Sequence, residues 1–237
     1  MRCFRSTDSG ETWTQSEDYV FPSWDESAIY HPAVQASDGI IYQPAFSAIT
    51  NKHGVHLWKS LDDGETWLPG PTISAQQSIA RNETAVAYVG SRVMIAIMRT
   101  NLTAGQKGTW DIARSTDNGA TWTVVGAATL ETNAEFVSPL LEVWTNANGV
   151  LMVSFYYGDR TTNKSYYRTA TADSLVSGTD ILGPSWSAAI ELHPYRLAYP
   201  NVVSDPFIPA RKLVTTYNES ASYESNLVTS TINVPLA

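Results

Sequence analysis

A single cysteine, Cys3, occurs among the 237 residues, so no disulfide bond can form within the chain. Long apolar runs are also absent, so we predict no membrane span, and the opening MRCFRSTDSG lacks the apolar segment of a signal peptide. Basic side chains are few, 15 against 23 acidic ones, and the net charge of −8 disfavours nucleic acid and anionic membranes as partners. A few local arginines can still bind a small anionic ligand.

Metal-binding patterns are missing as well. The four histidines, at positions 31, 53, 56 and 193, follow no zinc-ligand spacing and have no cysteine partners, so we predict neither a metal nor another cofactor. His53 and His56 lie near a predicted hairpin tip, where we expect them to be in solvent.

Helical periodicity is not found in any segment. Strand-like runs instead alternate with Gly, Asn and Pro, as in GIIYQPAF (39–46), RVMIAIMR (92–99) and VLMVSFYY (150–157). With 43% hydrophobic residues and no sign of a linker, the chain is predicted to be one all-β domain over residues 1–237.

One eight-residue motif recurs along the chain, as STDSGETW (6–13), SLDDGETW (60–67) and STDNGATW (115–122). Its aspartates, Asp8, Asp62 and Asp117, are 54 and 55 positions apart, which is room for about four short strands. A regular repeat of this length is typical of a β-propeller blade. A degraded fourth copy is expected at 171–186, around Asp173.

The motif has a structural interpretation. Asp and Ser side chains bind nearby backbone N–H groups and fix a tight turn, and Gly adopts a positive φ that other residues resist. We therefore interpret Asp8, Asp62 and Asp117 as turn residues on the outer rim. A metal-binding loop would need more oxygen ligands than one aspartate supplies.

The three motifs are Asp-box (BNR) repeats, and the residues around them resemble the sialidase (neuraminidase) superfamily. In that family an Asn-Glu pair precedes a strand ending in Arg and then an Asp box, which matches Asn82-Glu83, Arg99 and the box at 115–122. The segment 155–174 resembles the one that carries the third arginine of the family's triad, here Arg160. The segment 197–219 resembles the one that carries the nucleophilic tyrosine, here Tyr199.

The resemblance implies a six-bladed propeller of the sialidase type and a retaining exo-glycosidase that releases terminal sialic acid. Arg99 and Arg160 would hold the sugar carboxylate, because a guanidinium group matches a carboxylate in a bidentate manner. Tyr199 would be the nucleophile and Glu83 its base, since sialidases use a tyrosine in place of a carboxylate nucleophile. Glu219 would hold an arginine in place.

The chain also departs from the family pattern. The first triad arginine and the acid/base aspartate have no match, although Asp25 or Glu26 could replace the acid. The chain begins inside a box, so we expect about four to five blades, incomplete at the N-terminus and completed by an upstream segment or another chain. The expected partner is a sialylated or other acidic glycan, and the resemblance favours a secreted or cell-surface location.

Two other readings of the residues stay open. One is a non-catalytic propeller that binds carbohydrate or serves a structural role in a larger assembly. The other is a glycosidase on the same scaffold that acts on a different acidic sugar or polymer. Four further arginines, Arg81, Arg92, Arg114 and Arg168, are expected to be structural or on the surface.

Overall fold

In the part of the chain that the structure describes, five antiparallel sheets follow one another in sequence order. The computed structural model describes residues 2–18, 26–49, 52–75, 80–100, 107–130, 134–193, 197–204, 211–218 and 226–233. The first sheet pairs β1 (Arg2–Arg5) with β2 (Thr14–Asp18). The second contains β3 (Glu26–Ala28), β4 (Val34–Gln35), β5 (Ile41–Ile49), β6 (Lys52–Ser60) and β7 (Leu68–Ser74).

The other three sheets repeat the same up-and-down order. The third contains β8 (Thr84–Gly90), β9 (Val93–Arg99), β10 (Trp110–Ser115) and β11 (Thr123–Ala127). The fourth contains β12 (Phe136–Thr145), β13 (Leu151–Asp159), β14 (Lys164–Thr171) and β15 (Ile190–His193). The fifth contains β16 (Leu197–Ser204), β17 (Arg211–Asn218) and β18 (Asn226–Asn233).

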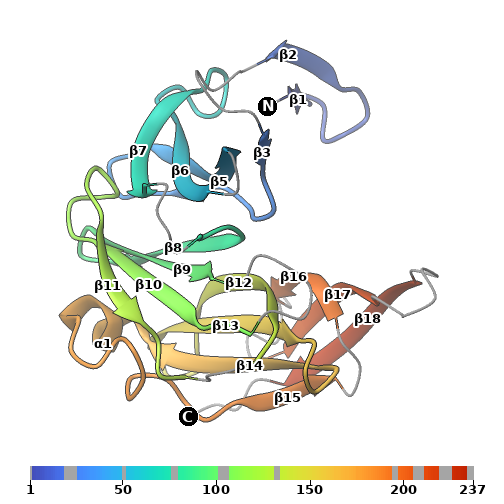
Figure 1. Cartoon of the computed structure of the whole chain (residues 1–237). Helices are drawn as coiled ribbons and strands as arrows, with labels where there is room; N and C mark the ends of the chain where they lie inside the picture. The colour runs from blue at the N-terminus through green and yellow to red at the C-terminus, as the bar shows by residue number, and fades with distance from the viewer. Residues whose placement is uncertain are drawn as a thin grey trace.

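The sheets are arranged as an open arc, from the N-terminal hairpin to β16–β18 (Figure 1). The first strands of neighbouring sheets meet along its inner side, where β4 contacts β8, β8 contacts β12, and β12 contacts β16. We call β4, β8, β12 and β16 the inner strands. Successive four-stranded sheets that meet along their first strands are the arrangement of propeller blades, and the predicted all-β architecture is therefore confirmed.

The core lies between neighbouring sheets, and β9 shows why. Every residue of this strand is buried, and its side chains alternate between two different clusters. Met94, Ala96 and Met98 pack against the second sheet, whereas Val93, Ile95 and Ile97 pack against the fourth. A strand covered on both faces reads as a continuous apolar run, as VMIAIM does here.

The largest cluster joins the third and fourth sheets. Trp110 stacks on Phe136 and meets Phe155 edge-on, with ring centroids 5.0 and 5.2 Å apart. A further cluster around Trp144 and Tyr156 extends to Val202 of the fifth sheet. Each sheet is thus held by its neighbours, because aromatic pairs of this kind bury large areas.

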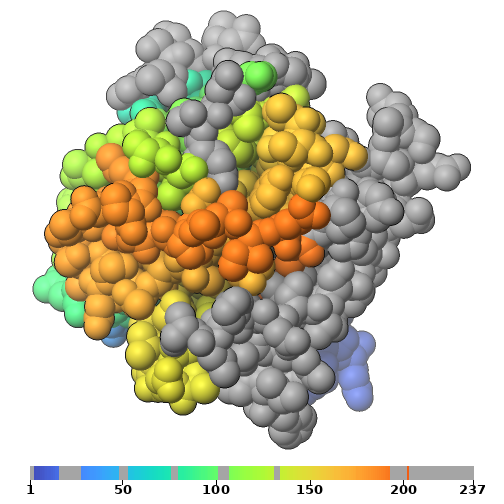
Figure 2. All heavy atoms as spheres, turned by 90° about the horizontal axis from the view of Figure 1, so that it is seen from below, coloured from blue at the N-terminus to red at the C-terminus, as the bar shows by residue number. Residues whose placement is uncertain are grey.

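A short helix, α1 (Ala172–Ser177), lies where the degraded fourth repeat was expected. Its six residues are too few to show a helical period, so the sequence shows no sign of it. Thr171 caps the helix by accepting a hydrogen bond from the Ser174 N–H, and Gly178 ends it at φ 74°. The connection occupies the same place between the third and fourth strands as an Asp box. The helix packs against β8, β13 and β14, and Arg114 of β10 donates a hydrogen bond to its Val176 carbonyl. The orange spheres that adjoin green ones in Figure 2 show this contact between the third and fourth sheets.

Candidate functional site

The three Asp boxes form the turns between the last two strands of their sheets, β1–β2, β6–β7 and β10–β11. In the third box the Ser115 hydroxyl donates to Asp117 Oδ1 (2.7 Å) and accepts from the Gly119 N–H (2.8 Å). The Thr121 N–H donates to the same carboxylate oxygen at 2.9 Å. The same bonds recur around Asp8 and Asp62. In an up-and-down sheet these turns lie at the end opposite to the start of the inner strand.

Every inner strand is irregular near its N-terminal end. The pairing of the second sheet is interrupted between Ala28 and Val34, and Asn82 and Glu83 both bond to the backbone of Arg99. The registers of the fourth and fifth sheets shift between Val137 and Leu140 and between Ala198 and Asn201. Bulges of this kind bend a strand and redirect its side chains, so these four places can form one site.

Glu83 is the best-defined residue of this region. It is buried directly before β8, and its Oε2 atom lies 3.1 Å from Nη1 of Arg99 at the end of β9. The same oxygen accepts a 2.8 Å hydrogen bond from the Ser138 N–H of the next sheet. Ser138 adopts φ 52°, which is uncommon for a residue with a side chain and presents its N–H to the carboxylate.

One donor of the Arg99 guanidinium group is unpaired within the described part of the chain. Its side chain is buried and paired with Glu83, and its Nε atom has no hydrogen-bond partner among the residues that the structure describes. A buried guanidinium donor without a partner costs free energy unless a ligand or water accepts from it.

Tyr30 and His31 belong to the same region, and the sequence reasoning missed them. Tyr30 and Thr84 line one small hollow together with His31 and Phe46. The pKa of Tyr30 is raised by burial and by the charge of Glu83, whereas the charge of Arg99 lowers it, so its hydroxyl lies within electrostatic reach of both. A signal was present, because His31, Ser138 and Tyr199 each precede a proline, which cannot donate to a strand ladder and favours a bulge.

Arg160 lies one sheet further along, directly after β13. Its Nη1 atom is 3.1 Å from Oε1 of Glu135, and its N–H donates to the Glu135 carbonyl at 2.8 Å. The pair continues the β12–β13 ladder at the N-terminal end of the inner strand. The structure therefore places Arg160 and Arg99 at the same end of adjacent sheets, and each is bound to its own glutamate.

Tyr199 lies on the inner strand β16, within its register shift. Its backbone is thus at the corresponding end of the fifth sheet, and the predicted contact with Glu83 stays a prediction. Glu219 and Asp25 lie outside the described residues, and Glu26 begins β3.

Two expectations about other polar residues need comment. Arg81 is buried, with Nε 2.7 Å from Asp111 Oδ2, so it links β10 to the segment before β8. His53 and His56 are partly buried rather than in solvent, because His53 stacks on Phe46 and His56 Nδ1 lies 2.9 Å from the Thr72 hydroxyl. Burial lowers the pKa of His56 to about 4.

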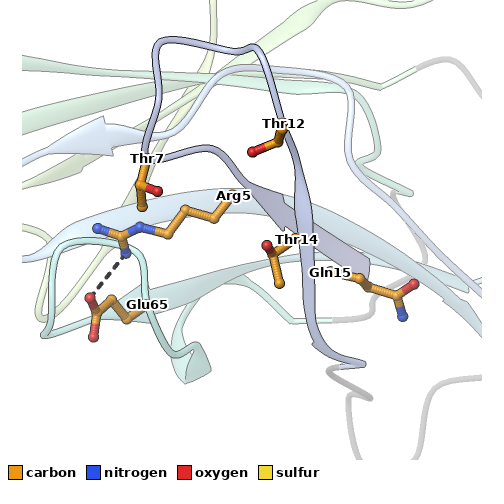
Figure 3. Close-up of a pocket in the computed structure, with 6 residues that line it drawn as sticks. All are labelled: Arg5, Thr7, Thr12, Thr14, Gln15 and Glu65. Atoms are coloured by element: carbon orange, nitrogen blue, oxygen red, sulfur yellow. Dashed lines mark ion pairs between the residues drawn. The ribbon is translucent and has the colours of Figure 1, made fainter.

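A second hollow, of about 250 Å³, lies between the β1–β2 hairpin and the box turn of the second sheet. Figure 3 shows Arg5 reaching across it to Glu65, with Nη1 3.5 Å from Oε1. Its other lining residues are Thr7, Thr12, Thr14 and Gln15. Both charged side chains are exposed and bind each other, so this hollow does not point to a ligand.

Within the described ranges, no group of three or more His, Cys, Asp or Glu side chains is arranged to hold a metal ion. Helices long and apolar enough to cross a membrane are likewise not found in this part of the chain.

Comparison with known proteins assigns the family. A sequence profile described as a BNR repeat-like domain matches residues 1–206, which is most of the chain. The chain belongs to the BNR repeat-like domain family. The resemblance seen in the Asp boxes is thereby confirmed at the level of the superfamily. A search of curated proteins found no match.

Several solved structures share the fold of this BNR repeat-like chain. A protein of unknown function from Dyadobacter fermentans matches with a TM-score of 0.67 and 20% identity, over 98% of this chain and 63% of that one. An α-L-arabinofuranosidase from Fusarium graminearum bound to an iminosugar inhibitor matches with a TM-score of 0.61 and 17% identity, over 88% and 63%. The Penicillium chrysogenum α-L-arabinanase complexed with arabinobiose matches with 0.61 and 16%, over 87% and 63%.

At such low identities, the TM-scores show a shared fold alone. This chain spans about 63% of the length of the structures it matches.

Proposed function

We propose that this chain carries the sugar-binding centre of a propeller glycoside hydrolase that releases a terminal sugar from a glycan. The observation that carries the proposal is the buried Glu83 carboxylate, held by Arg99 and by the Ser138 N–H at the N-terminal ends of the inner strands. A carboxylate fixed by donors from two sheets is positioned in advance for chemistry. The shared fold with an arabinofuranosidase and an arabinanase supports the same reaction class.

The reaction would proceed in two steps with retention. Tyr199 Oη attacks the anomeric carbon while Glu83 accepts the phenol proton, and the glycosidic C–O bond breaks. The leaving-group oxygen takes a proton from an acid that has no match in this sequence. Water then attacks the same carbon and gives its proton to the conjugate base of that acid. The C–O bond to Tyr199 breaks, Glu83 returns its proton to the phenolate oxygen, and the sugar is freed. Tyr30 is the second tyrosine to test as a nucleophile, because burial and also the charge of Glu83 raise the pKa of its hydroxyl.

The sugar we propose is acidic, with sialic acid as the leading example. Arg99 and Arg160 come from adjacent sheets, and the partnerless Nε of Arg99 can donate to a sugar carboxylate. A neutral furanose, as in the arabinobiose bound by the Penicillium enzyme, is the competing substrate. Each arginine is already bound to a glutamate. A neutral sugar would leave both ion pairs unchanged, whereas the carboxylate of an acidic sugar would share the guanidinium donors with the two glutamates.

The test is hydrolysis of two fluorogenic glycosides, an α-sialoside and an α-L-arabinofuranoside, by the full chain. We expect the wild type to hydrolyse the sialoside. Glu83→Gln and Tyr199→Phe should each abolish this turnover, whereas Tyr30→Phe should retain it. Glu65→Gln is the matched control, since Glu65 is an exposed carboxylate at the opposite end of its sheet. Turnover of the arabinofuranoside alone would overturn the proposal of an acidic substrate but would support glycoside hydrolysis.

Non-catalytic carbohydrate binding is the second candidate function. The observation that favours it is that Glu83, Arg99 and Arg160 are all engaged in ion pairs, which a purely structural role also explains. Hydrolysis of neither glycoside, together with binding of either sugar, would establish this alternative in place of the enzyme.

A further inference from the structure

Three aromatic rings form a row across the second sheet. Tyr30 stacks on Phe46 with ring centroids 5.5 Å apart and planes 6° apart, and Phe46 stacks on His53 at 5.6 Å and 9°. Tyr30 follows β3, Phe46 lies on β5 and His53 lies on β6, so the row runs outward from the inner strand. Tyr30 is 42% exposed although its ring is large and mostly apolar.

The inner end of this row lies beside the candidate site. Tyr30 and Phe46 line the same hollow as Thr84, which directly follows Glu83. The Tyr30 hydroxyl also responds to the charges of Glu83 and Arg99. An exposed aromatic ring therefore lies within electrostatic reach of the carboxylate to which we assign the chemistry.

His31 adds polar groups to the same hollow. Its side chain is 5% exposed, and neither ring nitrogen has a hydrogen-bond partner among the described residues. Burial lowers the pKa of His31 to about 3, so the ring is neutral near pH 7 and has one nitrogen that donates and one that accepts. The hollow has no room for a water molecule, so the His31 ring closes the space behind Tyr30 and its nitrogens are shielded from solvent.

We infer that the exposed ring of Tyr30, held from behind by Phe46, forms a binding subsite for the second sugar ring of a glycan whose terminal sugar lies at Glu83. The inference rests on the proposed function and adds a specificity element to it: the chain selects glycans of at least two sugar units.

The chemistry of the row fits a sugar ring. Each face of a pyranose or furanose carries C–H groups that pack on an aromatic face, while its rim carries hydroxyl groups. Tyr30 offers a flat apolar surface with a polar tip, and the parallel rings behind it hold it in one orientation. Sugar sites commonly combine apolar walls with a few placed polar groups in this way.

The test measures binding rather than turnover, by calorimetry and by saturation-transfer NMR on the full chain. The probes are arabinobiose and sialyllactose, each compared with its terminal monosaccharide. We expect Tyr30→Ala to weaken binding of the bound oligosaccharide about tenfold, which is the effect of losing ~1.4 kcal/mol. Binding of the monosaccharide should change less than about twofold. Tyr30→Phe, which keeps the ring, should restore most of the affinity.

Phe4→Ala is the matched control, because Phe4 is an exposed aromatic residue on β1 of a different sheet. Tyr30→Leu replaces Tyr30→Ala if circular dichroism shows that the alanine variant is unfolded. Equal affinity of Tyr30→Ala and the wild type for the oligosaccharide would overturn the subsite.

The subsite and the enzyme fail separately. Suppose that the wild type binds the oligosaccharide but hydrolyses neither glycoside, and that Tyr30→Ala loses this binding. That result would support the subsite and overturn the proposed catalysis. Wild-type chain that binds neither oligosaccharide would overturn both.

Discussion

The Oε2 atom of Glu83 accepts a 2.8 Å hydrogen bond from the backbone N–H of Ser138, which belongs to the neighbouring sheet. The same atom binds Arg99, so one carboxylate oxygen joins two strands of its own sheet to the start of the next inner strand. The bond fixes the spacing of β8 and β12 at the place where the proposed site opens.

The Glu83–Arg99 pair should therefore contribute strongly to stability. We expect Arg99→Met to lower the free energy of unfolding by about 3–5 kcal/mol, because it leaves the buried Glu83 carboxylate without its ionic partner. Urea unfolding measures this. The control, Arg5→Met, breaks the exposed pair with Glu65 and should cost less than about 1 kcal/mol. A loss in Arg99→Met no larger than that of the control would contradict the prediction.

Asp boxes of identical sequence pattern should differ in stability according to burial. Ser115→Ala leaves the buried Gly119 N–H without an acceptor, and we expect a loss of about 1–3 kcal/mol in unfolding free energy. Ser6→Ala removes the corresponding bond to Gly10, which is exposed, so water can replace it and the loss should be smaller. Equal losses for the two variants in thermal or urea unfolding would show that burial does not decide the effect.

The glycines of the boxes provide a second comparison. Gly119 and Gly64 have almost the same φ, 86° and 85°, so alanine meets the same backbone strain at both. A Cβ atom at Gly119 would lie 2.8 Å from Met94 Sδ, whereas at Gly64 the nearest atom is a Trp67 carbon at 3.9 Å. We expect Gly119→Ala to cost about 1–3 kcal/mol more than Gly64→Ala, because the packed core must shift. Similar unfolding midpoints would argue against this close contact.

Buried His31 should make stability depend on pH. Its pKa falls from 6.5 to about 3 on folding, so between these values the unfolded chain binds the proton that the folded chain excludes. The free energy of unfolding should therefore rise with pH over this window. The contribution of His31 is fully present above pH 6.5 and is lost as the pH falls towards 3. His31→Gln should flatten the rise when unfolding is measured from pH 3.5 to 7.

His56→Gln is the comparison variant for this pH dependence. Its effect should be smaller, because its pKa falls only to about 4 and its ring is partly exposed. An unchanged pH slope in His31→Gln would mean that the ring is not buried in the neutral form.

The repeat, the all-β class and the turn chemistry could be predicted from the sequence because they are local. STDNGATW carries its own hydrogen-bond donors and acceptors within eight residues, and VMIAIM is apolar because both faces of β9 are covered. Helix α1 was not predictable, because six residues are too few to show a helical period. The helix is stabilised by packing against β8 and β13, which the local sequence does not reveal.

The sequence by itself determined which residues could carry chemistry, since Glu83 and Arg99 follow the order of a known family. Only the tertiary structure decided what each one touches. Ser138 reaches Glu83 across 55 positions of sequence, and Tyr30 comes close to Glu83 from another sheet, because neighbouring inner strands meet only when the blades pack. Contacts of this kind depend on the packing of distant strands, and no spacing of residues along the chain encodes them.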